Sequence, residues 1–287
     1  MRFEAPETVE AAVGLMAGEK GEARALAGGT DLLVQMKSGR IAPDLVVDLK
    51  RIPGMTGIAE EGGGFRLGGA LPAAAMLEHD ALCKAWPGIV EAAWLVGSTQ
   101  VMGRASLAGN LCTSSPAADT VPAMVAAGAV ARIAGPGGTR EVPVEEIPQG
   151  VQKNALAKGE IVEAILLPAR PERSGDAYLR FIPRTEMDIA VVGCAVSLSL
   201  DEGGAVAEAR VALGAVATTV LLVEEAADAI VGTKLEESAL ERLAAACSAA
   251  CKPIDDKRGT AAFRTEVAGV LARRAALSAY ERAGGTA

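Results

Sequence analysis

The stretch Arg24-Ala-Leu-Ala-Gly-Gly-Thr-Asp-Leu-Leu33 joins a short apolar run to a pair of glycines and then to the start of a helix. The alternation from Arg24 to Ala27 indicates a buried strand. The two glycines lack a Cβ atom, so the backbone can reach positive φ and a ligand can approach the main chain closely. Thr30 or Asp31 then occupies the expected N-cap of a helix. A turn of this kind directs several unpaired N–H groups at one point, which favours phosphate binding.

Another interpretation of this stretch is an ordinary tight connection between a strand and a helix, without a ligand. The turn is neither the three-glycine dinucleotide fingerprint nor the P-loop, because a P-loop ends in Gly-Lys-Ser/Thr. A phosphate-containing cofactor at this turn would therefore be held by some other fold.

The composition indicates a large globular protein. A chain of 287 residues with 50% hydrophobic residues can bury a sizeable core and forms two or three compact units. The formal net charge of −8 argues against a nucleic-acid-binding protein, which needs clustered Lys and Arg. The first residues lack the apolar core of a signal peptide, and no run of about eighteen apolar residues follows. We therefore expect a cytoplasmic protein without membrane insertion.

Cysteine and histidine restrict the chemistry further. The five cysteines are scattered and form no CxxC pair, so we expect reduced thiols. Cys247 and Cys251 share one helical face and could be metal ligands, but the lack of a second pair favours a place in the core. His79 is the single histidine. Zinc sites with several histidines are therefore excluded, and a hydrolase with a Ser-His-Asp triad is disfavoured.

Periodicity and turn residues divide the chain into three units. Residues 1–55 predict an α/β unit with a parallel sheet, with strands at 2–4, 24–27 and 45–49 and helices at 8–17 and ending near 37. Residues 56–172 predict a hairpin within 58–67, helices at 72–85, 88–96 and 120–127, and strands at 130–134 and 160–167. Residues 173–287 predict an antiparallel sheet from strands at 176–181, 188–200 and 205–213, covered on one face by helices at 220–231, 235–250 and 260–283.

A second region rich in glycine and hydroxyl side chains runs from Ser106 to Asp119. It contains Gly109-Asn110, a dipeptide that tolerates positive φ, and several hydroxyls that can donate and accept hydrogen bonds. Taken alone, this region also fits a surface loop in which Asp119 caps the following helix.

Together, the two glycine regions resemble those of the FAD-binding medium subunit of the molybdenum hydroxylases, the family of xanthine dehydrogenase and aerobic carbon monoxide dehydrogenase. The resemblance covers nearly the whole chain. It is carried by Ala27-Gly-Gly-Thr-Asp-Leu32, by Ala105-Ser-Leu-Ala-Gly-Asn-Leu111 with Ser115-Pro-Ala-Ala-Asp119, by Arg180 with Met187-Asp-Ile-Ala190, and by Pro253-Ile-Asp-Asp-Lys-Arg-Gly259. The order and separation of these pieces make the match specific.

The resemblance implies an α+β chain. It implies a PCMH-type FAD-binding domain of two subdomains, 1–55 and 56–172, with the cofactor between them, and a smaller C-terminal α+β domain, 173–287. The residues implied to bind FAD are Ala25, Leu26, Ala27, Gly28, Gly29, Thr30, Asp31, Leu32, Ser106, Gly109, Asn110, Thr113, Asp119, Val162 and Arg180. We expect no covalent link to FAD, because His79 lies outside every candidate loop.

The family also implies a role for each part of this set. Residues 25–32 would hold the FAD pyrophosphate through backbone N–H groups. Ser106, Gly109 and Asn110 would lie beside the pyrophosphate and the flavin. Thr113 would lie near the ring system, Asp119 would bind a ribose hydroxyl, and Val162 would touch the flavin.

Three positions depart from the family's pattern. Arg180 stands where many relatives have lysine, so its contact with the cofactor differs in reach and geometry. Ala108 replaces the more usual glycine and adds a methyl group where the backbone approaches the cofactor. Ile189 stands where some relatives place an aromatic side chain beside the isoalloxazine.

In such enzymes a small subunit carries two [2Fe-2S] clusters and a large subunit carries the molybdenum cofactor, molybdopterin. The resemblance implies that this chain passes electrons from the clusters through FAD to an external acceptor. Because soluble oligomers usually have closed symmetry, we expect the complex to be a dimer of heterotrimers. NAD, oxygen, a ferredoxin and a quinone are all open as acceptors.

Two alternatives stay open, a stand-alone FAD-dependent oxidoreductase and a scaffold without a cofactor. The stand-alone enzyme would need an acid or base over the flavin, and the sequence offers no second cluster for this purpose. The 4-hydroxybenzoyl-CoA reductase type is a narrower alternative. Its inserted segment with cysteines has no counterpart between Val130 and Lys158.

Overall fold

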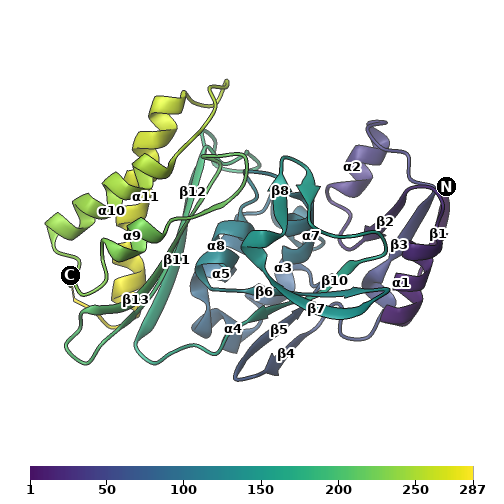
Figure 1. Ribbon diagram of the computed structural model, residues 1–287, viewed down its shortest axis with the longest axis horizontal. Helices are drawn as coiled ribbons and strands as arrows, with labels where there is room; N and C mark the ends of the chain where they lie inside the picture. Colours follow the sequence, from purple (N-terminus) through teal and green to yellow (C-terminus); the bar gives the residue numbers. More distant parts are fainter. Residues whose placement is uncertain (287) are drawn as a thin grey trace.

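The computed structural model describes residues 1–286. Figure 1 shows three units in chain order, with the amino-terminal unit and the C-terminal helices at opposite ends of an elongated molecule. Within the described residues, no helix combines the length and the apolar character that crossing a membrane requires.

The first unit is the predicted parallel sheet, with three strands in the order β1-β3-β2. Its elements are β1 (Arg2–Glu4), α1 (Val9–Gly18), β2 (Ala23–Leu26), α2 (Leu32–Lys37), β3 (Leu45–Asp48) and the 3-10 turn η1 (Leu49–Arg51). α1 begins where the Thr8 hydroxyl accepts the Ala11 N–H at 3.1 Å. In contrast, α2 buries no side chain and projects from the sheet (Figure 1).

The middle unit packs an antiparallel five-stranded sheet, in the order β4-β5-β10-β6-β7, against short helices. The strands are β4 (Ile58–Glu61), β5 (Gly64–Gly68), β6 (Val130–Gly135), β7 (Gly138–Pro143) and β10 (Ile161–Leu167), with a separate hairpin of β8 (Pro148–Gly150) and β9 (Lys153–Asn154). The helices are α3 (Ala73–Leu77), α4 (Asp80–Ala85), α5 (Pro87–Trp94), α6 (Thr99–Met102), α7 (Leu107–Thr113), α8 (Thr120–Ala126) and the 3-10 turn η2 (Val144–Glu146).

The single helix predicted over 72–85 is wrong, because the chain forms two helices there, α3 and α4. His79 separates them. Its Nδ1 accepts the Leu82 N–H at 3.2 Å, so the imidazole satisfies a backbone donor at the start of α4. The only histidine in the chain therefore has a capping role.

The third unit is an antiparallel sheet with helices on one face, as predicted (Figure 1). Its elements are β11 (Ser174–Phe181), β12 (Val192–Leu200), β13 (Val206–Gly214), β14 (Leu221–Leu222), α9 (Glu224–Asp228), α10 (Glu237–Ala250) and α11 (Ala261–Arg282). The helix predicted over 220–231 is wrong, since β14 occupies its first part and α9 is short. Residues 188–191, predicted as strand, precede β12.

The free face of the third unit's sheet packs on the middle unit. Tyr178, Ala195 and Ala212 share one buried core with α8. Polar contacts reinforce this junction, because Glu91 Oε2 in α5 accepts Arg282 Nη1 at 3.1 Å and the Tyr178 N–H at 3.2 Å. The two units therefore form a continuous interface.

Gly175 tests the packing of α11 on this sheet. A Cβ atom at Gly175 would overlap the carbonyl oxygen of Ala279, which belongs to the backbone of α11. We expect Gly175→Ala to lower the free energy of unfolding by about 1 to 3 kcal/mol, measured by urea unfolding. Gly14→Ala is the control, because a Cβ atom there meets nothing within 4 Å and alanine favours the helix. An equal loss in both variants would contradict the packing argument.

Candidate functional site

A cavity of about 550 Å³ lies between the first and middle units. Its lining comes from the turn after β2, from α7 and the residue before it, and from the segment between β8 and β10. All of the predicted site residues contribute to this lining except Leu26, Asp119 and Arg180. The structure thus brings together two glycine regions that lie about eighty residues apart, and at this size the cavity suits a cofactor.

The turn after β2 has the conformation that its glycines predict. Gly29 has a φ of +79°, in the left-handed region, and α2 begins three residues later. Asp31 is the N-cap residue, yet its side chain accepts no capping hydrogen bond and instead accepts the Thr113 hydroxyl at 3.3 Å. Within residues 1–286, the N–H groups from Gly28 to Asp31 have no acceptor. These donors are available to an anionic ligand.

The two glycines of the predicted turn have different structural roles. Gly28 lies directly against the backbone of the middle unit, where a Cβ atom would overlap the carbonyl oxygen of Arg104. That close approach joins the two walls of the cavity through main-chain atoms. The residues present therefore fit a phosphate-containing group, since they combine free N–H donors with a backbone cradle that side chains would fill.

The region after Ser106 is a helix, α7, and not a plain surface loop. The Ser106 hydroxyl accepts the Gly109 N–H at 3.1 Å and so starts the helix. Asn110 Oδ1 accepts both the N–H of Thr120, at 3.1 Å, and its hydroxyl, at 2.7 Å. Because a backbone N–H can only donate, the amide oxygen of Asn110 must face Thr120. Asn110 lines the cavity, and its NH₂ group has no acceptor among the described residues.

Asp119 lies outside the cavity lining, at the junction with the third unit. Its carboxylate accepts Arg180 Nη1 at 2.9 Å and the Tyr178 hydroxyl at 3.3 Å, and the residue is only 9% exposed. It makes no capping hydrogen bond to α8. Burial raises the pKa of Asp119 to about 6, although the Arg180 guanidinium opposes this shift. The neighbouring Arg180 Nε is buried without a partner among the described residues.

The segment from Gln152 to Ile161 also contributes to the lining of the cavity. None of these residues was predicted from the sequence, although the adjacent Val162 was. The segment is tied to the end of α7, because Asn154 Nδ2 donates to the Cys112 carbonyl oxygen at 2.8 Å and the Gln152 N–H donates to that of Ser114 at 3.0 Å. Within this segment, Gly159 was the one residue whose type indicated a turn with positive φ, and its φ is +87°.

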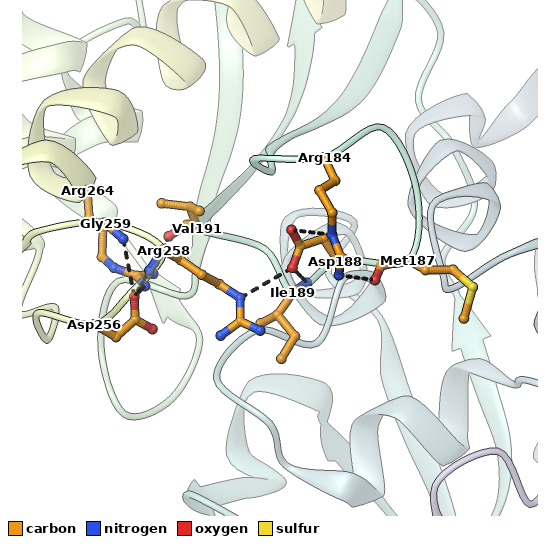
Figure 2. A network of polar contacts seen from close by, with 9 residues as sticks. All are labelled: Arg184, Met187, Asp188, Ile189, Val191, Asp256, Arg258, Gly259 and Arg264. Atoms are coloured by element: carbon orange, nitrogen blue, oxygen red, sulfur yellow. Dashed lines mark hydrogen bonds and ion pairs between the residues drawn. The ribbon is translucent and has the colours of Figure 1, made fainter.

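Two of the quoted motifs, Met187 to Ala190 and Pro253 to Gly259, lie side by side in the third unit (Figure 2). Asp188 accepts Arg258 Nε at 3.3 Å, Arg184 Nε at 3.2 Å and the Ile189 N–H at 2.8 Å. The last of these bonds is the main reason that the pKa of Asp188 is lowered.

The buried Arg264 extends this network. Its Nη2 donates to Asp256 Oδ1 at 2.8 Å, and its Nη1 donates to the Val191 carbonyl oxygen at 2.6 Å. Arg258 and Arg264 therefore both bind the loop that leads into β12. Met187 and Ile189 in this loop are exposed. The described residues contain no group of three or more acidic, cysteine or histidine side chains that could hold a metal ion.

Comparisons with known proteins show the family to which the chain belongs. Residues 1–170 match the model of the FAD-binding domain in molybdopterin dehydrogenase, and residues 177–279 match that of the CO dehydrogenase flavoprotein C-terminal domain. The chain belongs to this family of flavoprotein subunits.

Among individual relatives, the carbon monoxide dehydrogenase medium chain of Afipia carboxidovorans is 34% identical, over 98% of this chain and 97% of that protein. The xanthine dehydrogenase FAD-binding subunit of Escherichia coli O157:H7 is 28% identical, over 97% of this chain and 95% of that protein. A solved structure of reconstituted CO dehydrogenase from Oligotropha carboxidovorans superimposes with a TM-score of 0.93 at 35% identity, covering 98% of both chains.

The buried carboxyl of Asp119 gives a prediction about pH. Its pKa is raised from an ordinary value of 3.8 to about 6, so the folded state favours the protonated form. The resulting stabilisation is complete below the unfolded pKa and is lost as the pH rises through about 6. Relative to Asp119→Asn, we expect the wild type to lose about 2 kcal/mol of unfolding free energy between about pH 4.5 and 7.5.

Urea unfolding of both proteins across this pH range measures the difference. The comparison with Asp119→Asn cancels the titration of the other carboxyl groups. Parallel pH profiles would show that Asp119 is not buried as described.

Proposed function

We propose that this chain is the FAD-binding electron-transfer subunit of a heteromeric molybdenum hydroxylase. The observation that carries the proposal is the cavity between the first two units, with its row of free N–H donors at the turn after β2. Family membership supports the same conclusion, since the matched models describe an FAD-binding domain and a flavoprotein C-terminal domain.

The chain's own residues would bind FAD in two ways. The N–H groups from Gly28 to Asp31 would hold the pyrophosphate, because clustered backbone donors bind a dianion without a lysine cluster. The Asn110 NH₂ group and α7 would hold the parts of FAD nearest the middle unit, with Val162 on the β10 side. Asp119 and Arg180 would act at the edge of the site, where their ion pair joins the middle and third units.

We propose that the FAD is bound non-covalently. His79 caps α4 and does not line the cavity. Cys112 does line it, but burial raises the pKa of this thiol to about 12, which keeps it protonated and unreactive as a nucleophile. Neither side chain is suited to form a covalent bond to the flavin.

Bound FAD supplies the exchange between single-electron transfer with iron–sulfur clusters and transfer to an external acceptor. The iron–sulfur clusters and the molybdopterin would reside in partner subunits, as expected for a family whose model describes the FAD-binding domain in molybdopterin dehydrogenase. The name of the Afipia relative, a medium chain, supports partnership with a smaller and a larger chain. We propose a dimer of such heterotrimers, because most soluble oligomers have closed symmetry.

The five free cysteines suit a reducing compartment, and we propose that the complex resides in the cytoplasm.

The turn at Gly29 gives the first test. Valine there would be strained at a φ of +79°, and its Cβ atom would lie 2.9 Å from Leu26 Cδ1 and 3.1 Å from Leu33 Cδ1. We expect Gly29→Val to be folded and to bind FAD at least about tenfold more weakly, since the free N–H groups would be displaced. FAD is measured in the supernatant after acid precipitation, which counts only non-covalent cofactor.

Gly39→Val is the matched control, because Gly39 also has a positive φ, of +71°, but lies outside the cavity and meets nothing within 4 Å. It carries the same kind of backbone penalty without the loss of the donors. The proposal fails if Gly29→Val keeps FAD at the stoichiometry of the wild type.

Partnership gives a second test. We expect the chain, isolated from its native host by an affinity tag, to co-purify with an iron–sulfur subunit and a molybdopterin subunit. Metal analysis should then find iron and molybdenum with the flavin, and native mass measurement should give the mass of two heterotrimers. Purification of the chain alone with full substrate turnover would replace this proposal by a stand-alone flavoenzyme.

A further inference from the structure

We propose that Lys50 is a positioning residue for the turn that binds the FAD pyrophosphate. The inference rests on the proposed function and deepens it. Lys50 does not line the cavity, so it would act on the cofactor only through the turn.

Lys50 lies in η1, directly behind the turn. Its Nζ donates to the Ala27 carbonyl oxygen at 2.7 Å and to Asp48 Oδ1 at 2.6 Å. Asp48 Oδ1 also accepts the Lys50 N–H at 3.0 Å, and the lysine side chain is only 25% exposed. The ammonium group is therefore fixed by two oxygen atoms and by the local backbone.

The need for this contact follows from the sheet. The ladder between β2 and β3 ends where Leu26 pairs with Asp48. Ala27 is the first residue beyond it and has no facing strand residue to bind its carbonyl oxygen. The Lys50 side chain donates the hydrogen bond that a facing strand residue would otherwise donate. The peptide that follows β2 is therefore held in place like those of the strand.

That peptide is the one that carries the first free donor. The Ala27 carbonyl and the Gly28 N–H belong to a single trans peptide, so they point in opposite directions. Fixing the carbonyl on Lys50 directs the Gly28 N–H away from Lys50. Ala27 and Gly28 line the cavity, and within residues 1–286 this N–H has no acceptor. The lysine thus holds the N–H as a free donor at the cavity.

The charge of Lys50 adds to its geometry. An ammonium group on a peptide carbonyl polarises the peptide and strengthens the opposite N–H as a donor. The carboxylate of Asp48 balances the lysine charge, so the effect is confined to groups in direct contact. The stronger N–H donor would form a stronger hydrogen bond to a phosphate oxygen bound by the turn.

The test uses the full-length chain without cofactor and three probes: FAD, ADP, which keeps the pyrophosphate, and adenosine, which has no phosphate. We expect Lys50→Met to weaken FAD and ADP by about tenfold, the loss of one charge-assisted contact, and to leave adenosine within about twofold. Lys37→Met is the control, because Lys37 is an exposed lysine of the same unit outside the cavity, and it should change none of the three.

A general structural role would weaken adenosine as much as ADP, and this result would overturn the inference. So would FAD and ADP affinities of Lys50→Met within about twofold of the wild type. Both results leave the proposed function intact, whereas failure of the wild type to bind FAD would reject the proposed function itself. If Lys50→Met does not fold, Lys50→Gln, whose shorter side chain lacks the ammonium group, is measured with the same probes and judged by the same results.

Discussion

The contact on which the cavity depends is the approach of Gly28 to the carbonyl oxygen of Arg104. Any side chain at Gly28 would overlap this oxygen, so glycine alone lets the turn after β2 rest on the middle unit. The next residue, Ala105, is anchored in turn, because its carbonyl oxygen accepts the Ala73 N–H at 2.8 Å. The two walls of the cavity are thus spaced by main-chain atoms, which are less mobile than side chains, and the free N–H groups keep their place opposite α7.

A chain of hydrogen bonds joins this cavity to the C-terminal unit. Asn110 at the cavity binds Thr120, and the adjacent Asp119 binds Arg180 and Tyr178 on β11. Tyr178 fits there only because its cross-strand neighbourhood includes Gly193, where a Cβ atom would lie 2.7 Å from the tyrosine hydroxyl oxygen. The C-terminal unit is therefore linked to the cavity through Asp119 without lining it.

Local patterns predicted most of the fold, and contacts between distant segments explain the rest. The strand, glycine turn and helix around Gly29 are determined by residues that are close in the sequence, so they could be predicted from it. The break at His79 was missed because an imidazole is an uncommon helix cap. The pairing of Asp119 with Arg180 spans 61 residues, and no spacing in the sequence indicates it. The lining segment before Val162 was missed for the same reason, since it has no motif and is placed by α7.

Few cationic side chains line the cavity, so the proposed binding of a pyrophosphate would rest largely on the backbone. The chain has a net charge of −8, and the charged side chains of the lining are Arg24, Lys158, Asp31 and Glu160. Glu160 is paired with Arg140, with its Oε1 2.8 Å from Nε. Arg24 is further engaged by Glu22, with Nε 2.7 Å from Oε1. A pyrophosphate bound in this cavity would meet few cationic side chains, and oriented N–H dipoles would supply much of its attraction. Dipoles act over short distances and in fixed directions, so the exact placement of each peptide matters more here than in a lysine-rich site. On this proposal, Lys50 would contribute to binding through the turn, although it does not line the cavity.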